Sequence, residues 1–153
     1  MNRLRYEQTL PISLDQAWNF FSMPENLCRI TPDWMCFDIK HKDAEHMYPG
    51  MIIEYSIKAV AGIPMSWITE ITHVEKPYFF VDEQRQGPYR FWHHQHHFRQ
   101  TDAGVEVTDT VHYSLYFGML AEPVRRLLVL PKLKEIFSFR RDALERIFSS
   151  RSY

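Results

Sequence analysis

Residues 50–59, with the sequence GMIIEYSIKA, decide the character of the middle of the chain. The odd positions from 51 to 57 are all apolar, whereas Glu54, Ser56 and Lys58 lie between them or beside them. Successive side chains of a β-strand point to opposite faces, so this alternation predicts a strand with one buried face and one wetted face. Strands of this kind are typical of antiparallel sheets.

The same two-residue period extends to both sides of this strand and is interrupted by turn residues. Pro-Gly, Gly-Pro and Asp-Ala-Gly sequences separate the alternating runs, and such residues favour turns between strands. A further run of looser alternation precedes Pro11. We therefore expect seven strands, at residues 3–10, 35–42, 50–59, 64–75, 78–85, 89–101 and 105–116.

Two short helices are expected between the first two strands. Ser13 is suited to cap a helix over residues 14–22, because its hydroxyl can accept a hydrogen bond from the first turn. Apolar residues recur in this segment at the helical spacing of three and four. A second helix over residues 25–30 ends before Pro32, which cannot continue it.

The last third of the chain changes to a helical period. Apolar residues recur from Leu120 to about Phe148, which predicts one long amphipathic helix with a kink near Pro131. At 1.5 Å per residue this helix is about 40 Å long, enough to cross a curved sheet. The order of elements predicts an α+β helix-grip fold, in which a strongly curved antiparallel sheet of about seven strands wraps around the C-terminal helix. No linker or repeat interrupts residues 1–153, so we expect a single domain.

The composition excludes several classes of protein. Of the 153 residues, 45% are hydrophobic and 24% are charged, which is typical of a globular chain rather than a disordered one. The net charge of −1 gives no electrostatic reason to expect nucleic acid as a partner. The sequence has no run of 18 apolar residues, no resemblance to a secretory signal at its start, and only two cysteines. We therefore expect a cytoplasmic protein without a transmembrane helix.

The charge is unevenly distributed along the chain. Residues 120–153 contain eight Lys or Arg residues and four Asp or Glu residues, which gives this segment a net charge of +4. A basic amphipathic helix can rest on an anionic membrane, or it can be a docked helix whose polar face is solvated. Both interpretations remain open, and the sequence does not predict the oligomeric state.

Three segments resemble a known group of proteins. They are PISLDQAWNFFSMPENLCRITP (residues 11–32), FVDEQRQGPYRFWHHQHHF (residues 80–98) and TDTVHYSLYFG (residues 108–118). The first is similar to the opening of SRPBCC proteins, the START-like superfamily that includes polyketide cyclases and pollen allergens. The W-x-H-x-H-x-F spacing at residues 92–98 resembles bacterial ligand-binding SRPBCC domain proteins. The resemblance implies a helix-grip fold, but the superfamily contains enzymes, lipid carriers and hormone receptors, so it implies no single function.

A histidine cluster is the densest polar feature of the predicted sheet. Alternation over residues 91–99 places His94 and His96 on the inward face with their aromatic neighbours, because the opposite face carries an arginine. Asp109 lies among apolar positions of the next strand. A buried carboxylate without a partner costs several kcal/mol, so we expect Asp109 to pair with His94 or His96. A glycine bulge at residue 104 would change the strand register by one residue, and both registers remain open.

Three interpretations of the histidine cluster remain open. It can be a self-satisfied hydrogen-bond network in the core, the polar end of an apolar ligand pocket, or an acid–base or metal site. A His-x-His pair on a strand can chelate zinc or iron. However, Gly87 is one residue too far from His94 for the cupin spacing, and Gln100 and Thr101 stand where a glutamate is expected. We therefore expect no metal and no cofactor.

The sequence favours a binding protein. Aromatic residues make up 15% of the chain, an excess that often lines a cavity, and the common catalytic motifs are absent from the sequence. We expect a small hydrophobic ligand (a lipid, a polyketide-like or an aromatic molecule) between the sheet and the C-terminal helix. One alternative is a cyclase or dehydratase of the polyketide type with His94, His96 or Asp109 as its acid–base group. A second is a lipid or quinone carrier that contacts membranes. The predicted ligand-binding residues are Tyr55, Trp67, Gln84, Trp92, His94, His96, Phe98, Asp109, Tyr113 and Phe137.

Overall fold

Seven antiparallel strands form one sheet in the computed structural model, which describes residues 1–60, 62–116 and 121–149. The order across the sheet is β1-β7-β6-β5-β4-β3-β2, so six consecutive strands form a meander and the first strand is added beside the last. The seven predicted strands are confirmed. Their bounds are β1 (Asn2–Leu10), β2 (Asp38–His41), β3 (Ile52–Val60), β4 (Ile63–Glu75), β5 (Phe79–Gln86), β6 (Phe91–Thr101) and β7 (Gly104–Ser114).

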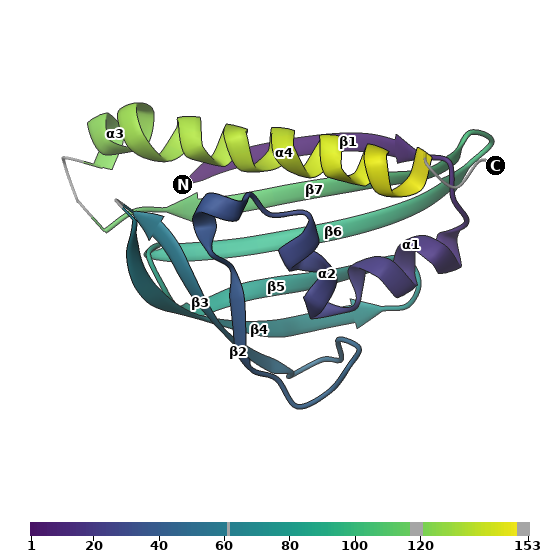
Figure 1. Ribbon diagram of the computed structural model, residues 1–153, viewed down its shortest axis with the longest axis horizontal. Helices are drawn as coiled ribbons and strands as arrows, with labels where there is room; N and C mark the ends of the chain where they lie inside the picture. The colour runs from purple at the N-terminus through teal and green to yellow at the C-terminus, as the bar shows by residue number, and fades with distance from the viewer. Residues whose placement is uncertain (61, 117–120, 150–153) are drawn as a thin grey trace.

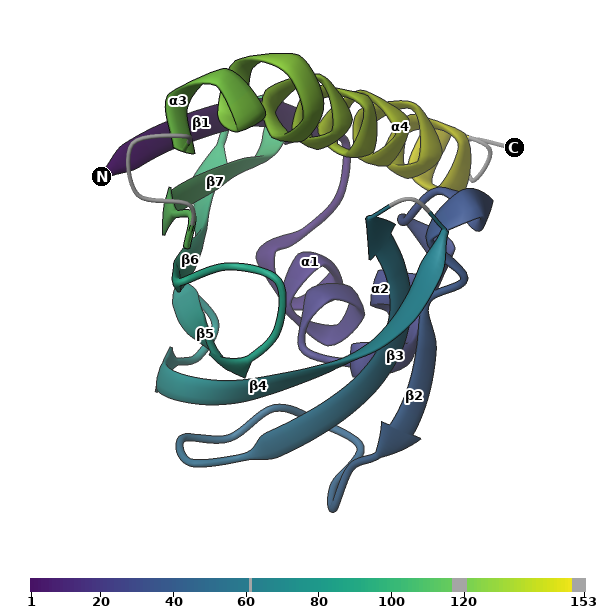
Figure 2. The same ribbon diagram turned by 90° about the vertical axis from the view of Figure 1, so that its left-hand side faces the viewer.

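The sheet is strongly curved and holds the helices on its concave side. Figure 1 shows the last helix, α4 (Leu130–Ser149), running along β1 and β7. In the perpendicular view the sheet bends from β1 round to β2, with α4 across the open side (Figure 2). Two short helices, α1 (Leu14–Phe21) and α2 (Pro24–Arg29), lie inside the curve. This is the predicted α+β helix-grip architecture.

The sequence of α1 explains why a helix begins directly after the first strand. The Ser13 hydroxyl accepts a hydrogen bond from the Gln16 amide, and the Gln16 side chain accepts one from the Ser13 amide. This capping box satisfies two donors that the first helical turn would otherwise leave unpaired. The buried face of α1 then places the ring of Trp18 edge-on to Phe80 and Phe98, which anchors the helix against the sheet.

The hairpin of β6 and β7 has a single register. Thr101 pairs with Gly104 and the pairing continues without a shift to the far end, so His96 lies opposite Asp109. Gly104 has a φ of 124°, and a Cβ atom built there would overlap the carbonyl oxygen of Leu10. Only glycine fits such a backbone and such a close approach. The turn residue therefore fixes which side chains of the two strands face each other.

Two predicted elements differ from the structure. The strand expected at residues 35–42 begins only at Asp38, because residues Asp33–Met35 form a 3₁₀ turn (η1) and Cys36 has a left-handed φ of 44°. A left-handed residue interrupts extended backbone, so strand pairing cannot start before it.

The C-terminal helix differs in a similar way. It consists of α3 (Ala121–Val124), a π-helical turn η3 (Arg125–Val129) and α4. The irregularity predicted near Pro131 thus lies in the preceding turn, because proline has no N–H to donate and its ring displaces the carbonyl one turn earlier. Leu120, the expected start, lies outside the described residues.

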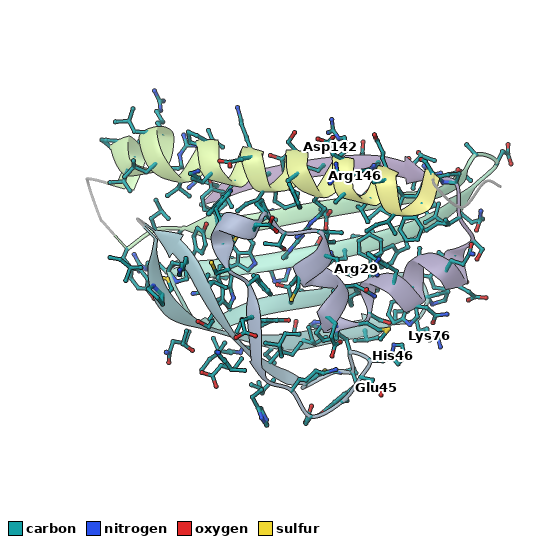
Figure 3. All side chains as sticks on the ribbon, viewed as in Figure 1. Arg29, Glu45, His46, Lys76, Asp142 and Arg146 are labelled. Carbon is teal, nitrogen blue, oxygen red and sulfur yellow. The ribbon has the colours of Figure 1, made fainter. Side chains whose placement is uncertain are left out.

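The outward side of α4 is polar. Asp142 and Arg146 lie on this side, away from the sheet, and both are exposed (Figure 3). The opposite side buries Leu133, Phe137 and Leu144 against the sheet. Within the described residues, no helix is both long and apolar enough to cross a membrane.

Candidate ligand-binding cavity

A cavity of about 700 Å³ lies between the concave face of the sheet and α4. Strands β3 to β6 supply one wall, α4 supplies another, and α1, α2 and η1 close a third. The lining is predominantly apolar and aromatic. It includes Leu27, Ile30, Trp34, Met35, Phe37, Met47, Tyr55, Trp67, Ile71, Phe80, Tyr89, Trp92, Leu133, Ile136 and Phe137.

The cavity opens to solvent beside the π-helical turn. Leu127 and Leu128 both line the cavity, yet they are 75% and 62% exposed. Trp34 of η1, which also lines the cavity, is held by α4, since its indole N–H donates to Glu135 at 2.8 Å and the Lys132 ammonium lies 4.4 Å from its ring centroid. The cavity lining therefore includes two exposed leucines and the indole ring of Trp34, which is fixed by its contacts with α4.

A cluster of five ionisable side chains lies on the cavity's sheet wall beside α4. Adjacent strands supply Asp82 from β5, His94 and His96 from β6 and Asp109 from β7, and α4 adds Arg140. Strand pairing explains the proximity, because Asp82 lies opposite His94 and His96 lies opposite Asp109. The inward orientation predicted for His94, His96 and Asp109 is confirmed, since each is at most 6% exposed.

Each histidine contacts both carboxylates. His94 Nε2 donates a hydrogen bond to Asp109 Oδ1 at 2.9 Å, and His94 Nδ1 lies 3.4 Å from Asp82 Oδ2. His96 Nε2 donates to Asp82 Oδ2 at 2.8 Å, and His96 Nδ1 lies 2.8 Å from Asp109 Oδ1. The predicted pairing of Asp109 with a histidine is therefore confirmed, and it involves both histidines rather than one.

The electrostatics of the cluster keep both carboxylates ionised. Burial raises the pKa of Asp109, but hydrogen bonds from His94 and His96 and the charge of Arg140 outweigh it and hold the pKa well below its usual value. Burial likewise raises the pKa of Asp82, and the neighbouring histidines and Arg140 reverse the shift to a lowered value. A buried carboxylate that accepts charged hydrogen bonds behaves in this way.

The pKa values of the two histidines are shifted in opposite directions. Burial lowers the pKa of His96, but its contacts with Asp109 and Asp82 outweigh burial and raise it. The pKa of His94 is lowered, first by burial and then by the charge of His96. One histidine of the pair is thus favoured as the cation and the other as the neutral imidazole.

Arg140 is the other cation of the cluster. Its Nη1 lies 3.6 Å from Asp109 Oδ1, and its guanidinium carbon lies 4.9 Å from the Phe137 ring centroid. The residue is 7% exposed and lines the cavity. Among the described residues, its Nε and Nη1 atoms have no hydrogen-bond acceptor. Two nitrogen atoms of a buried guanidinium therefore donate no hydrogen bond within the described part of the chain, although Nη1 takes part in the ion pair with Asp109.

Six of the predicted ligand-binding residues line the cavity: Tyr55, Trp67, Trp92, His94, His96 and Phe137. The other four lie elsewhere. The Gln84 side chain donates to the Tyr89 carbonyl at 2.6 Å and accepts from the Tyr89 amide at 3.2 Å, so it fixes the β5–β6 connection instead. Phe98 packs into the core, where its ring centroid lies 5.1 Å from that of Phe21. Asp109 and Tyr113 are not among the lining residues; both are buried, and Asp109 is bound to its histidines.

Two residues of the cluster were absent from the predicted set. Asp82 lies on the same strand face as Phe80, so the alternation in β5 indicated an inward orientation. An outward orientation was equally compatible with the sequence. Arg140 falls on the buried stripe of α4 with Leu133, Phe137 and Leu144. Its spacing from those residues was a signal, but an arginine on an amphipathic helix is normally assigned to the solvated face.

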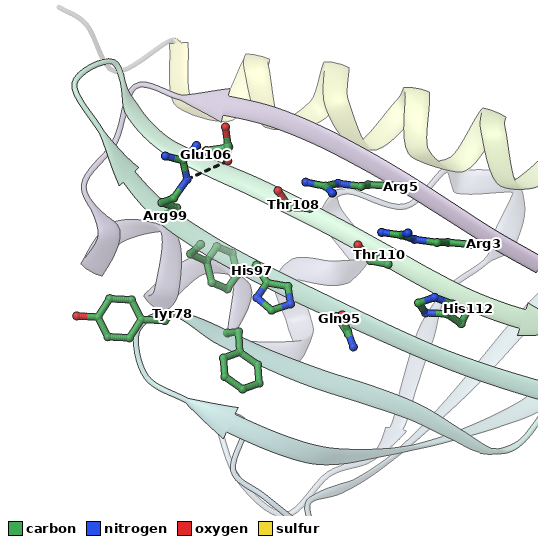
Figure 4. A pocket seen from close by; sticks show the side chains of 12 residues that line it. Arg3, Arg5, Tyr78, Gln95, His97, Arg99, Glu106, Thr108, Thr110 and His112 are labelled. Atoms are coloured by element: carbon green, nitrogen blue, oxygen red, sulfur yellow. Dashed lines mark hydrogen bonds and ion pairs between the residues drawn. The ribbon is translucent and has the colours of Figure 1, made fainter.

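A second concavity lies on the opposite, outer face of the sheet. Figure 4 shows its polar lining, in which Arg3 and Arg5 of β1 project beside Thr108, Thr110 and His112 of β7. It is a shallow hollow with charged walls. An ion pair between Arg99 and Glu106 lies on its wall at 2.8 Å and is partly exposed to solvent, which distinguishes this hollow from the apolar cavity.

Solved structures with the same architecture are numerous but distant in sequence. TTHA0849 from Thermus thermophilus has a TM-score of 0.72 at 14% identity, over 99% of this chain and 100% of its own. CV1439 from Chromobacterium violaceum has a TM-score of 0.70 at 11% identity, with coverage of 97% and 98%. Ara h 8.0201 has a TM-score of 0.58 at 15% identity, with coverage of 94% and 97%.

Comparisons of sequence alone find no relative of this chain. No protein-family model matches the chain, and the curated proteins contain no match to it. At identities of 11–15% the structural likeness establishes the fold and not the activity. The resemblance of residues 11–32 and 80–98 to START-like proteins agrees with that likeness. The chain therefore has a helix-grip fold, which it shares with these solved structures.

Proposed function

We propose that this protein binds a small, largely apolar molecule in the cavity between the sheet and α4. The single observation that carries the proposal is the cavity itself, with about 700 Å³ of space and a predominantly aromatic and aliphatic lining. Sites for small molecules commonly have volumes of roughly 300–1,000 Å³, apolar walls and a few polar groups. Proteins with this fold commonly bind hydrophobic ligands, which supports the same conclusion.

The cluster at the wall beside α4 favours a ligand with a polar end. Arg140 presents a buried guanidinium to the cavity, and two of its nitrogen atoms donate no hydrogen bond within the described residues. A buried donor without an acceptor costs about 1–3 kcal/mol, so a ligand oxygen that accepts from Arg140 would recover that energy. We infer that the apolar body of the ligand lies among Trp67, Trp92 and Ile136 while an oxygen faces Arg140.

A fluorescence titration with N-phenyl-1-naphthylamine, an uncharged apolar probe, tests this proposal. Wild type is expected to bind one probe per chain with saturation. Ile136→Trp adds bulk at a cavity wall and is expected to weaken binding at least about tenfold, which corresponds to 1.4 kcal/mol. Ile63→Trp is the matched control, because Ile63 is 61% exposed and does not line the cavity. Equal binding by the two variants would contradict the proposal.

A second candidate function is exchange of the ligand at a membrane surface. Leu127 and Leu128 are exposed at the cavity opening, and the exposed Arg126 and Lys132 lie nearby along the helix, where each is ion-paired with a glutamate, Glu122 and Glu135 respectively. Apolar residues flanked by cations suit a surface of anionic lipids. Flotation with anionic vesicles tests the idea: binding at low salt that is lost in Leu127→Ser supports it, and no flotation at low salt excludes it.

A further inference from the structure

Three side chains on the cavity wall bring potential metal ligands together. One ligand atom each from Asp82, His94 and His96 can be chosen so that all three lie within 4.8 Å of one another. All three residues line the cavity, whereas Asp109 lies behind them. Two histidines and one carboxylate on a single face, with space on the other side, make a partial coordination sphere that is open toward the cavity.

Asp109 orients the two imidazoles toward Asp82. His94 donates its Nε2–H to Asp109, so in the neutral imidazole the Nδ1 atom carries a lone pair, and Nδ1 lies 3.4 Å from Asp82 Oδ2. His96 Nδ1 lies 2.8 Å from Asp109 Oδ1 without hydrogen-bond geometry, and His96 Nε2, which donates to Asp82 Oδ2 at 2.8 Å, would release that proton on binding a metal. A carboxylate behind a histidine fixes its tautomer and makes the exposed nitrogen a better ligand, as in carboxylate–histidine–zinc arrangements.

The charges of the cluster leave a place for one cation. With both imidazoles neutral, Asp82 and Asp109 carry two negative charges and Arg140 carries one positive charge. All of these groups are buried or nearly so. A buried net charge of −1 is costly, so the cluster favours a bound cation. A divalent ion between the three side chains would bring two positive charges, more than the single net negative charge of the cluster.

We propose that Asp82, His94 and His96 form a binding site for a first-row divalent transition metal ion, with Asp109 as the residue that positions both histidines. Two nitrogen donors and one oxygen donor suit Zn²⁺, Fe²⁺ or Co²⁺ better than Mg²⁺ or Ca²⁺, which prefer oxygen alone. The proposal reverses the expectation of no metal. That expectation rested on cupin spacing along β6, whereas the third ligand comes from β5, the neighbouring strand.

The position of the site extends the proposed function. Three protein ligands leave coordination positions free on the cavity side, where a ligand oxygen or water can bind. A metal at this point acts as a Lewis acid on whatever oxygen it holds. The polar end of the cavity would then be a metal cation bound by Asp82, His94 and His96. The inference does not depend on the apolar ligand, because the metal ligands all belong to the chain.

Titration of tag-free, chelator-treated protein with Co²⁺ alone tests the site. We expect one Co²⁺ per chain, visible absorption bands of a low-coordinate ion, and displacement by Zn²⁺. Asp82→Asn removes a ligand and is expected to weaken binding by more than the 10–100-fold that is typical of changes behind the ligands. His93→Gln/His97→Gln is the control, since both residues belong to the outward face of β6, and it should bind Co²⁺ as wild type does.

A measurement on wild type alone covers the case in which Asp82→Asn fails to fold. In protein labelled with ¹⁵N-histidine, Zn²⁺ is expected to shift the ring nitrogens of His94 and His96 at one equivalent. The eight histidines of the chain make the outer ones an internal reference. The proposal is overturned if Co²⁺ and Zn²⁺ do not bind at one equivalent, or if only outer histidines shift, or if the control variant loses binding.

Discussion

Asp109→Asn is the substitution that most directly probes the buried cluster. Asparagine keeps the shape of the side chain but removes its charge, so hydrogen bonds from the histidines to its amide oxygen are weaker than those to the carboxylate. In wild type, Asp109 compensates His96 and Arg140, both of which are at most 7% exposed. Removing one partner of a buried ion pair typically costs about 3–5 kcal/mol, because the other partner stays buried without compensation.

This loss of stability is large enough to measure by several methods. For a chain of about 150 residues, 1 kcal/mol corresponds to roughly 2–4 °C in Tm, so Asp109→Asn should lower Tm by roughly 6–20 °C. Urea unfolding followed by tryptophan fluorescence, with a chelator present, gives the free energy of unfolding directly. Asp142→Asn is the matched control: Asp142 is exposed on the outward side of α4, and the change should stay within about 0.5 kcal/mol.

The pH dependence of the loss has a definite sign. The folded pKa of Asp109 is lowered, so its contribution to stability is complete above the unfolded value of about 3.9 and is lost as the pH falls through the folded pKa. The difference between wild type and Asp109→Asn should therefore be full near pH 6 and should shrink below about pH 4.

His96 contributes with the opposite sign. Its folded pKa is raised, so its contribution is complete below about pH 6.5 and is lost as the pH rises through the raised pKa. Asp109→Asn removes one of the two carboxylates that raise this pKa, so the alkaline loss should be smaller in the variant and should be complete at lower pH. A difference below about 1 kcal/mol at pH 6, or one that is constant from pH 6 to pH 3, would refute this account of the cluster.

Three further substitutions test the cavity and the elements that shape it. Trp67→Ala removes a ring that lines the cavity and lies 5.3 Å from Trp92, so titration should show roughly tenfold weaker binding of N-phenyl-1-naphthylamine. Gln84→Ala removes both hydrogen bonds to the Tyr89 backbone; it should cost about 1–3 kcal/mol and speed hydrogen exchange at the Tyr89 amide. Gly104→Ala should cost at least about 1–3 kcal/mol in urea unfolding, because the alanine Cβ would overlap the Leu10 carbonyl oxygen in a left-handed backbone.

The fold was predictable because its signals are local. The alternation over residues 50–59 and the capping residue Ser13 each specify an element from a few neighbouring residues, and the structure has both elements. The inward orientation of His94 and His96 follows from the same alternation. Local patterns also explain the error at residues 35–42, since nothing in the sequence marks Cys36 as left-handed.

The cluster was only half predictable because it joins four elements. The pairing of Asp109 with a histidine followed from the cost of burying a lone carboxylate, which is a local argument. Asp82 belongs to the cluster because β5 lies beside β6 in the sheet. Arg140 belongs to it because of the rotation of α4 about its own axis. Neither the strand order nor the rotation of the helix can be predicted from the residue spacing within one segment. Gln84 was predicted to line the cavity, but its side chain binds the backbone of Tyr89 instead. The strand face alone does not determine whether a flexible amide reaches the cavity or a neighbouring loop.

The central claim, that an apolar molecule enters the cavity beneath α4, is tested most directly by NMR of the methionine methyl groups. Met35 and Met47 line the cavity, whereas Met1 is 82% exposed and Met51 is buried in the core outside the lining. We predict that N-phenyl-1-naphthylamine shifts the methyl signals of Met35 and Met47 and saturates at one probe per chain, while the Met1 signal stays fixed. Unchanged Met35 and Met47 signals at saturating probe, or shifts confined to Met1, would contradict the claim.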